Sequence, residues 1–443
     1  MTRIFRGFSS VSAYRAVGIG AFAVASTGCS ADGAPSSDPA HRAASLTGTA
    51  SVVAAADAGP GDDGTGDEPP SADGGEAGTY LLGKFLFAED ETATTAVAAA
   101  SASDPAELAR FEPGAGGLIV PDVQLPVPFG NDVFVTDALA PEIVRYHVGA
   151  DGTLVESGRL SFAETGIDLF TGWQVSIASA TKAYLFDTPS LRVIVWDPST
   201  LTVTGELELS LAAREGYTFD VGAREARSSN GLLYVPGYWY SDEDFSSLKT
   251  SGVVVIDPAT DELSLAEDSR CAAYSLVVQP NGDVHMFPDG YFAQEFYLDL
   301  EAPRAPTCSV TLRAGSREFD PDGWVDLGAL VGGDEFVGGA VQGGVGDGRG
   351  GIFIAVGDEQ RYLDGEANVY RWWRWDVAAG TATELGDTPY WSAYMGSYTT
   401  GDQVFSILPG DESTLVIEAS KEPLAAFELP GWVEVFTRLS PLE

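Results

Sequence analysis

Cysteine, histidine and positive charge are scarce in this chain. Its 443 residues include three cysteines and three histidines, too few for a zinc, haem or iron–sulfur site with several such ligands. Lysine and arginine number 24 against 65 acidic residues, so the net charge is −41. Nucleic acids and anionic membrane surfaces select dense positive charge, so neither is expected as a partner of the general surface.

Long apolar runs are absent from the N-terminal region. The stretch Ala16–Ser26 is too short to span a bilayer, and three arginines but no acid occur before Cys29, which is the layout of a secretory signal. The following Ser26-Thr-Gly-Cys29 resembles the bacterial lipobox, in which the cysteine is acylated, with Ser26 where leucine is preferred. We expect an exported cell-envelope lipoprotein at the outer membrane or cell surface, anchored through Cys29. The alternative is a soluble secreted protein that loses Cys29 with its signal peptide.

Residues 30–78 contain no aromatic side chain and nine acids. Alanine, glycine, serine, aspartate and proline dominate them, and such a composition cannot bury enough surface to offset the entropy of ordering. The sequence therefore predicts a signal peptide over residues 1–28, a disordered acidic linker over 29–78 and a folded domain over 79–443. Most of the 65 acids belong to the folded domain.

Short runs rich in Val, Ile, Phe, Tyr and Trp alternate with Gly, Pro, Asp and Asn after Thr79, a pattern typical of β-strands. One module of three runs recurs, at residues 182–209, 231–265 and 351–385. Its Asp-Pro-x-Thr segments at 197–200 and 257–260 predict hairpin turns, because aspartate accepts local backbone hydrogen bonds and proline fixes φ. These strings resemble the repeats of bacterial YVTN-type propeller proteins.

Recurrence about every 40 to 60 residues, with four strands each, predicts an all-β protein with a β-propeller fold. The expected second strands lie near Tyr80, Val133, Tyr184, Leu233, Val284, Phe353 and Val404, which predicts seven blades. The C-terminal run 432–439 has no blade of its own. We expect it to form the innermost strand of the first blade, which closes the ring and removes exposed strand edges. A ring of six or eight blades and a pair of β-sandwiches are the alternatives.

Cys271 and Cys308 remain once Cys29 is acylated. An even remainder in an exported protein favours a disulfide, worth roughly 3–4 kcal/mol by chain entropy. The predicted strand order opposes it, because Cys271 would enter an inner strand and Cys308 an outer one, at opposite ends of a blade. Either the strand edges differ from this prediction or the thiols stay apart.

Loops from second to third strand and from blade to blade emerge on one face of a propeller, and the longest predicted loops, Arg313–Phe336 among them, belong to these classes. Long loops on a rigid scaffold commonly carry binding sites, and aromatic and arginine side chains suit that task. The candidate ligand face comprises Arg214, Tyr217, Tyr238, Trp239, Tyr240, Trp324, Arg361, Tyr362 and Trp391. Individual rings could instead plug the channel or wedge between blades.

Arg224 and Arg227 are expected on the inner strand of the fourth blade. They could line the channel and meet an anion there. The alternative is that they pair with nearby acids such as Glu225.

Motifs for catalysis are missing. Neither G-x-S-x-G nor H-E-x-x-H occurs, and His147 and His285 lie on predicted strands as packed or surface residues. No cofactor is expected. Calcium is the metal that the acidic segments Asp320–Gly323 and Asp242–Asp244 could bind, although neither has the spacing of a complete calcium loop. The segment Gly343–Gly348 precedes a strand and not a helix, so we interpret it as a hairpin turn and not a nucleotide loop.

Four segments together resemble a family of propeller lipoproteins encoded beside catecholate-siderophore (myxochelin-type) genes in myxobacteria. They are Ala213–Tyr217, Asp268–Cys271, the segment around Cys308 and Tyr370–Asp376. The resemblance implies a surface or outer-membrane propeller associated with iron–siderophore handling. Ferric catecholates are anionic, so this acidic protein would repel them unless a local arginine cluster intervenes.

The leading hypothesis is a non-enzymatic, lipid-anchored, monomeric propeller whose loop-rich face binds a protein partner or a siderophore-like small molecule. The second hypothesis is a calcium-dependent propeller hydrolase or lyase acting on an extracellular small molecule. The third is a structural surface protein without a small-molecule ligand. Ligand identity is not readable from the residues, because propellers host many unrelated functions.

Overall fold

A computed structural model describes residues 78–87, 92–110, 117–243, 246–288, 307–332, 341–357, 361, 370–386, 396–400, 403–408, 413–418 and 425–439. Contacts divide the chain into Met1–Gly74 and Gly75–Glu443, and every described residue belongs to the second unit. The predicted signal peptide, the linker up to residue 77 and Cys29 lie outside the described residues. Among those described, no helix has the length and apolarity to cross a membrane.

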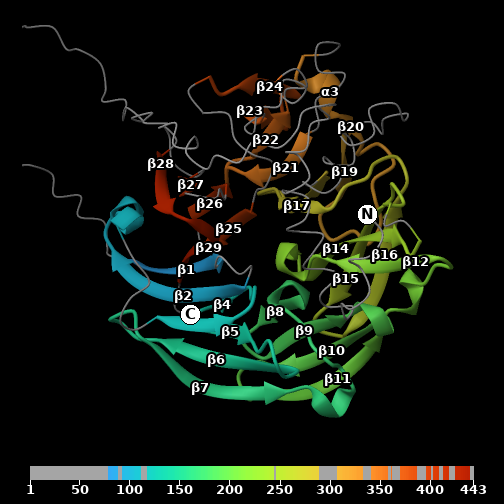
Figure 1. Ribbon diagram of the computed structural model, residues 1–443. Helices are drawn as coiled ribbons and strands as arrows, with labels where there is room; N and C mark the ends of the chain where they lie inside the picture. Colours follow the sequence, from blue (N-terminus) through green and yellow to red (C-terminus); the bar gives the residue numbers. More distant parts are fainter. Residues whose placement is uncertain are drawn as a thin grey trace, which may run out of the picture. The chain divides into compact units, whose positions relative to one another are not determined.

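Seven antiparallel sheets make up the second unit and follow one another around a ring, from blue to red in Figure 1. Each sheet is a blade. From the innermost strand outward, blade 1 contains β29 (Trp432–Leu439), β1 (Gly78–Phe87), β2 (Ala93–Ala102) and β3 (Leu118–Pro121). In the same direction, blade 2 contains β4 (Val127–Phe129), β5 (Asp132–Thr136), β6 (Glu142–Val148) and β7 (Leu154–Ser161). Blade 3 contains β8 (Val175–Ser179), β9 (Lys182–Asp187), β10 (Arg192–Asp197) and β11 (Thr202–Glu208).

Blade 4 has a divided inner strand, β12 (Tyr217–Val221) and β13 (Arg227–Ser229), followed by β14 (Leu232–Ser241), β15 (Ser251–Asp257) and β16 (Glu262–Asp268). Blade 5 contains β17 (Ser275–Val278), β18 (Val284–Phe287), β19 (Cys308–Leu312) and β20 (Val325–Asp326). Blade 6 contains β21 (Val341–Gly346), β22 (Gly351–Gly357), β23 (Tyr370–Asp376) and β24 (Thr381–Glu384). Blade 7 contains β25 (Gly396–Thr400), β26 (Gln403–Leu408), β27 (Ser413–Glu418) and β28 (Ala425–Pro430).

Short helices occupy connections between strands. They are η2 (Pro105–Arg110), η3 (Ala163–Thr165), η4 (Gly172–Gln174), η5 (Thr188–Ser190), η6 (Ser210–Ala212), η7 (Ala223–Glu225) and α3 (Leu327–Leu330). The predicted all-β, seven-bladed fold is confirmed, and each of the seven predicted second strands is the second strand of its blade.

Apolar side chains between neighbouring blades form the core. Among the described residues, seven buried clusters each join two adjacent blades, so every contact around the ring has its own cluster. The cluster between blades 7 and 1 packs Phe405 of β26 against Phe436 of β29, with ring centroids 5.1 Å apart. The middle strand β15 is buried on both faces, because its continuous apolar run packs against the blades on either side. The outermost strand β11, by contrast, is almost wholly exposed.

The C-terminal strand closes the ring as predicted. β29 pairs antiparallel with β1, with Tyr80 opposite Arg438 and Phe85 opposite Trp432. The first blade thus takes its inner strand from the end of the chain and its other strands from the start, so the inner edge of β1 is paired. The alanine-rich run in the same blade does form a strand, β2.

The two Asp-Pro-x-Thr segments form the predicted hairpin turns. The carboxylate of Asp197 accepts backbone hydrogen bonds from Ser199 and Thr200, at 2.7 and 3.2 Å. The carboxylate of Asp257 likewise accepts from the amide of Ala259 at 2.9 Å. Each turn joins the third strand of its blade to the fourth.

The disulfide between Cys271 and Cys308 is present. Cys308 is the first residue of β19, the third strand of blade 5, so the prediction that it enters an outer strand is wrong. The start of a third strand and the entry to an inner strand lie at the same end of a blade, which brings the two cysteines together. The interpretation of Gly343–Gly348 as a turn is also wrong in part, because β21 extends to Gly346 and the turn follows it.

Candidate functional site

We call the loop-rich end of the ring the upper face. Its described segments include 122–126, 137–141, 162–174, 188–191, 209–216, 242–243 with 246–250, 269–274 and 327–332, together with Phe87 at the end of β1. These segments connect second to third strands or one blade to the next, so the topology places them at one end of the ring. Tyr362 and Trp391 of the predicted ligand face lie outside the described residues, and Arg361 is half-buried between β22 and β23.

Trp324 is the predicted face residue that the topology moves elsewhere. It lies in the connection from β19 to β20, third to fourth strand, which leaves the blade at the end opposite the upper face. The placement of residues 313–324 on the upper face is therefore wrong, whereas residues 327–332 follow the fourth strand and lie in the connection to blade 6, as predicted. Leu312 and Phe319 form an isolated bridge, so residues 313–319 extend the hairpin and Trp324 lies on the blade's outer rim.

Arg214, Tyr217 and Trp239 gather where blades 3 and 4 meet at the upper face. Trp239 is fully buried and donates from its indole nitrogen to the carbonyl of Ala212 at 2.8 Å. The Arg214 guanidinium lies 4.0 Å from the centroid of that ring and pairs with Glu267. Trp239 therefore wedges between blades, which was the structural alternative for these rings, and Arg214 covers it.

The inner strand of blade 4 bulges between β12 and β13. Val221 pairs with Gly237 and Arg227 with Tyr234, so five residues, 222–226, stand opposite only two residues of β14. Pro236 lies in that gap, and its carbonyl accepts from the amide of Gly222 at 2.9 Å. Proline has no backbone N–H that could donate to an inner strand. The pairing of the inner strand with β14 is therefore interrupted at a residue where no N–H hydrogen bond is lost.

The bulge carries Arg224 across to blade 1. Its Nη1 donates to Oε2 of Glu434 on β29 at 3.1 Å, and these two side chains are 5% and 4% exposed. Its Nε lies 3.4 Å from Glu225, and its guanidinium carbon is 4.6 Å from the ring centroid of Trp173. Arg227 pairs with the other oxygen of Glu225 at 3.3 Å. Both arginines thus pair with acids, as the alternative interpretation expected.

A second group faces blade 5 from the same inner strand. Asp220 on β12 stands opposite Tyr238 on β14, and the Tyr238 hydroxyl donates to its carboxylate. The backbone amide of Val221 also donates to it, at 2.9 Å. Burial is the main cause that raises the pKa of Asp220 to about 7, against the opposing effect of those two hydrogen bonds.

Tyr274, from the 269–274 connection, completes this group. Its ring centroid lies 5.0 Å from that of Tyr238 at an interplanar angle of 89°, and the ring centroid of Tyr240 lies 6.1 Å from that of Tyr238. Asp220 and Tyr274 were not among the sequence candidates. Asp220 could have been noticed as the one acid within the inner strand Tyr217–Val221, but Tyr274 carries no such signal.

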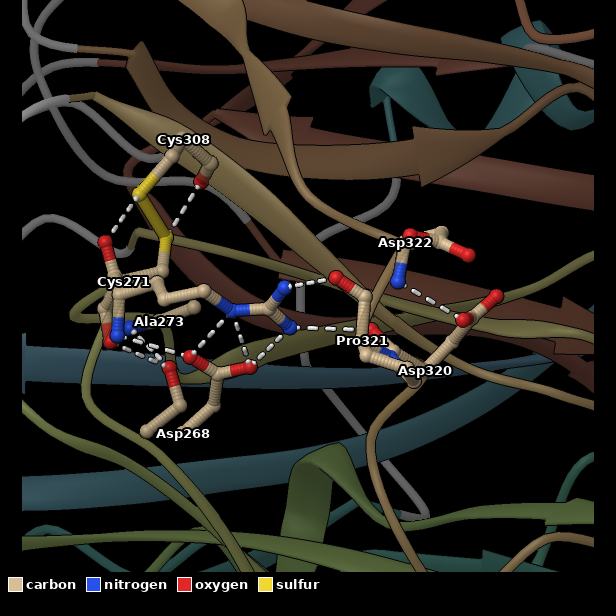
Figure 2. A network of polar contacts seen from close by, with 9 residues as sticks. Asp268, Cys271, Ala273, Cys308, Asp320, Pro321 and Asp322 are labelled. Carbon is tan, nitrogen blue, oxygen red and sulfur yellow. Dashed lines mark hydrogen bonds and ion pairs between the residues drawn. A yellow bond between two sulfur atoms is a disulfide. The ribbon is translucent and has the colours of Figure 1, made fainter.

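Arginine side chains bind the acidic segment Asp320–Gly323, one of the two segments proposed for calcium. Figure 2 shows Asp320, Pro321 and Asp322 of this segment. The Asp320 carboxylate accepts from the amide of Asp322 at 2.9 Å and pairs with Arg313. Arg270 binds the 4% exposed carboxylate of Asp268 and the carbonyl of Asp320, the latter at 2.9 Å, beside the disulfide. Within the part of the chain that the structure describes, no group of three or more His, Cys, Asp and Glu residues is arranged to hold a metal ion.

Both histidines on predicted strands do lie on strands. His147 on β6 pairs with Asp132 at 2.8 Å. His285 on β18 is buried, contacts Thr311 at 3.0 Å, and burial lowers its pKa to about 4. Such an imidazole stays neutral at physiological pH.

The six most exposed large apolar side chains among the described residues fall into two groups. Leu139 is 83% exposed, Leu211 60% and Phe87 48%, and all three belong to the upper face. Ile119, Val155 and Val203 lie instead on the outermost strands β3, β7 and β11. A rim hollow of about 370 Å³ between β7 and β11 is lined by Leu160, Leu201 and Val203, among others.

Comparison with known protein families and with curated proteins finds no match to this sequence. Some solved structures are similar to this chain. The periplasmic gluconolactonase of Pseudomonas aeruginosa shares 12% identity at a TM-score of 0.46, over 83% of this chain and all of that one. The apocarotenoid oxygenase of Synechocystis shares 8% identity at a TM-score of 0.43, over 82% of this chain and 93% of that one. Similarity at this level carries no argument about activity.

Proposed function

We propose that the protein is a binding propeller of the cell envelope, anchored through Cys29, whose upper face holds a protein partner. The observation that supports this most is the set of apolar side chains on that face, Leu139, Leu211 and Phe87. Isolated exposed apolar residues are ordinary, but loops on a rigid scaffold are where binding residues concentrate. Large apolar side chains contribute strongly to association when a partner removes them from water.

Site-specific photo-crosslinking in intact cells tests the proposal. A photoreactive amino acid replaces Leu139 or Leu211 on the upper face, and Val155 or Val203 on the outer rim serves as the matched control. The face positions should give one discrete adduct that the rim positions do not give. Absence of an adduct, or the same adducts from face and rim, would count against an upper-face partner.

The resemblance to siderophore-associated lipoproteins supports a finer proposal, that the protein takes part in iron–siderophore handling. Arg224 in the bulge and Arg227 on β13 belong to the inner strand of blade 4, and both pair with glutamates. A ferric catecholate would have to displace Glu225 or Glu434 to reach them. Titration with a ferric catecholate at modest salt, read by tryptophan fluorescence, should give saturable quenching if this finer proposal holds. A titration without a saturable change in tryptophan fluorescence would refute the proposed role in iron–siderophore handling.

A further inference from the structure

Three tyrosines and one carboxylate meet where blades 4 and 5 join at the upper face. This aromatic corner consists of Asp220, Tyr238, Tyr240 and Tyr274. Tyr238 and Tyr240 are alternate residues of β14, so both side chains project from the same side of the sheet. Tyr274 comes from blade 5, and its backbone amide donates to the carbonyl of Phe287 at 2.7 Å.

The bulge in the inner strand makes room for this arrangement. Gly222 is the first residue after β12, and a Cβ there would lie 2.6 Å from the Tyr274 hydroxyl oxygen. Glycine therefore permits Tyr274 to reach over from blade 5. Its ring stands perpendicular to Tyr238, which forms a corner of two π faces beside the carboxylate of Asp220.

Asp220 differs from the other acids near the channel. Glu225 and Glu434 each pair with an arginine. None of the ion pairs between described residues includes Asp220, whose carboxylate is held by a tyrosine hydroxyl and a backbone amide. All four residues of the corner are half-buried, so a ligand can still reach them while water is partly excluded.

We propose that the aromatic corner binds an organic ammonium cation with a methylated headgroup. The faces of tyrosine rings attract such cations through the ring quadrupole, and perpendicular rings present two faces to one cation. The carboxylate of Asp220 supplies the opposite charge, and the strongly acidic protein raises the local concentration of cations. This ligand class rests on the proposed binding function and extends it to a small molecule.

Calorimetric titration of the full chain tests the corner. Choline chloride and tetramethylammonium chloride are the probes, and 3,3-dimethylbutan-1-ol is the neutral isostere of choline. Choline should bind saturably, and the isostere should bind at least about tenfold more weakly because it lacks the charge. Equal affinity for choline and its isostere, or no saturable binding of either cation, would overturn the proposal.

Variants separate the corner from the rest of the protein. Asp220→Asn and Tyr274→Leu should each weaken choline binding about tenfold or more, while Glu208→Gln on the exposed strand β11 should leave it unchanged. Tyr238→Phe keeps the ring but removes its hydrogen bond, so it should retain most of the affinity. Choline binding that survives Asp220→Asn and Tyr274→Leu in folded protein, checked by circular dichroism, would place the cation elsewhere and refute the assignment.

A methylated ammonium headgroup could be free or part of a lipid. Flotation with phosphatidylcholine vesicles, with and without excess choline, distinguishes these sources: competition by choline indicates the lipid headgroup, and no flotation indicates the free cation. The crosslinking experiment on Leu139 and Leu211 is independent of this site. Discrete adducts without choline binding would refute the cation site at the aromatic corner but leave the proposed protein partner standing. Choline binding without adducts would refute the protein partner but leave the cation site standing.

Discussion

Replacing Asp220 by asparagine should stabilise the protein, and the gain should increase with pH. The carboxyl group loses its proton near pH 4 in the unfolded chain but, because of burial, near pH 7 in the folded protein. Between these values folding takes up a proton, so the wild-type protein loses stability as pH rises from about 4 to 7 and no further above it. Asparagine has the same shape and keeps an oxygen for the Val221 amide, but it does not titrate.

The size of the effect follows from the two pKa values. A carboxyl pKa raised from 3.8 to about 7 corresponds to an upper limit of about 4 kcal/mol at high pH. Part of this penalty is present already at pH 5, and water in the half-buried site screens the charge. We therefore expect the difference between variant and wild type to grow by about 1–3 kcal/mol from pH 5 to pH 8.

Urea denaturation at pH 5, 6, 7 and 8 measures this difference. The remaining acids titrate in both proteins, so their contributions cancel. Glu208→Gln, which removes one exposed carboxylate from β11, is the matched control and should show a small difference that hardly depends on pH. A difference for Asp220→Asn that is the same at pH 5 and pH 8 would refute the argument that this carboxyl group is desolvated.

Four further outcomes are expected. Replacing Cys271 and Cys308 by serine should cost roughly 3–4 kcal/mol of unfolding free energy in urea, because the disulfide spans 37 residues of chain. Glu434→Ala should cost about 3–5 kcal/mol because it leaves Arg224 buried without this partner, and a double variant with apolar residues at both positions should recover part of the loss. Cys29→Ser should move the protein from the membrane fraction to the soluble fraction, and continued sedimentation with membranes would refute the anchor. EDTA should leave Tm unchanged, and a shift of several degrees would support the calcium-dependent alternative.

Strand positions and blade number were predictable because they depend on local pattern. The runs at Lys182–Asp187 and Val253–Asp257 are mostly apolar over the length of one strand. Asp-Pro turns mark where the third strand of each of these two blades ends and the fourth begins. Ring closure was predictable for a different reason. The predicted strand Trp432–Leu439 was left over after seven blades had been assigned, and an unpaired strand is expected to pair with the free edge of a sheet.

Connections between strands were predicted less well. Twenty residues, 288–307, separate β18 from β19. Because this stretch is long, Cys308 was expected to enter an outer strand of blade 5, whereas it begins the third strand. Nothing local marks which of several apolar runs becomes the third strand. The assignment of residues 313–324 to the upper face failed for the same reason, since one misplaced strand moves the adjoining loop to the opposite end.

The sequence by itself determined the all-β class, the seven repeats and the acidic composition, because each follows from residue type and spacing along the chain. Only the tertiary structure decided which residues meet. Arg224 and Glu434 lie 210 positions apart and pair because closure brings blade 4 and the C-terminal strand to one channel. Asp220 and Tyr274 approach because the inner strand bulges at Gly222, a backbone event that a strand pattern does not reveal. Contacts between blades depend on the ring as a whole, and that is why the candidate site emerged from the fold.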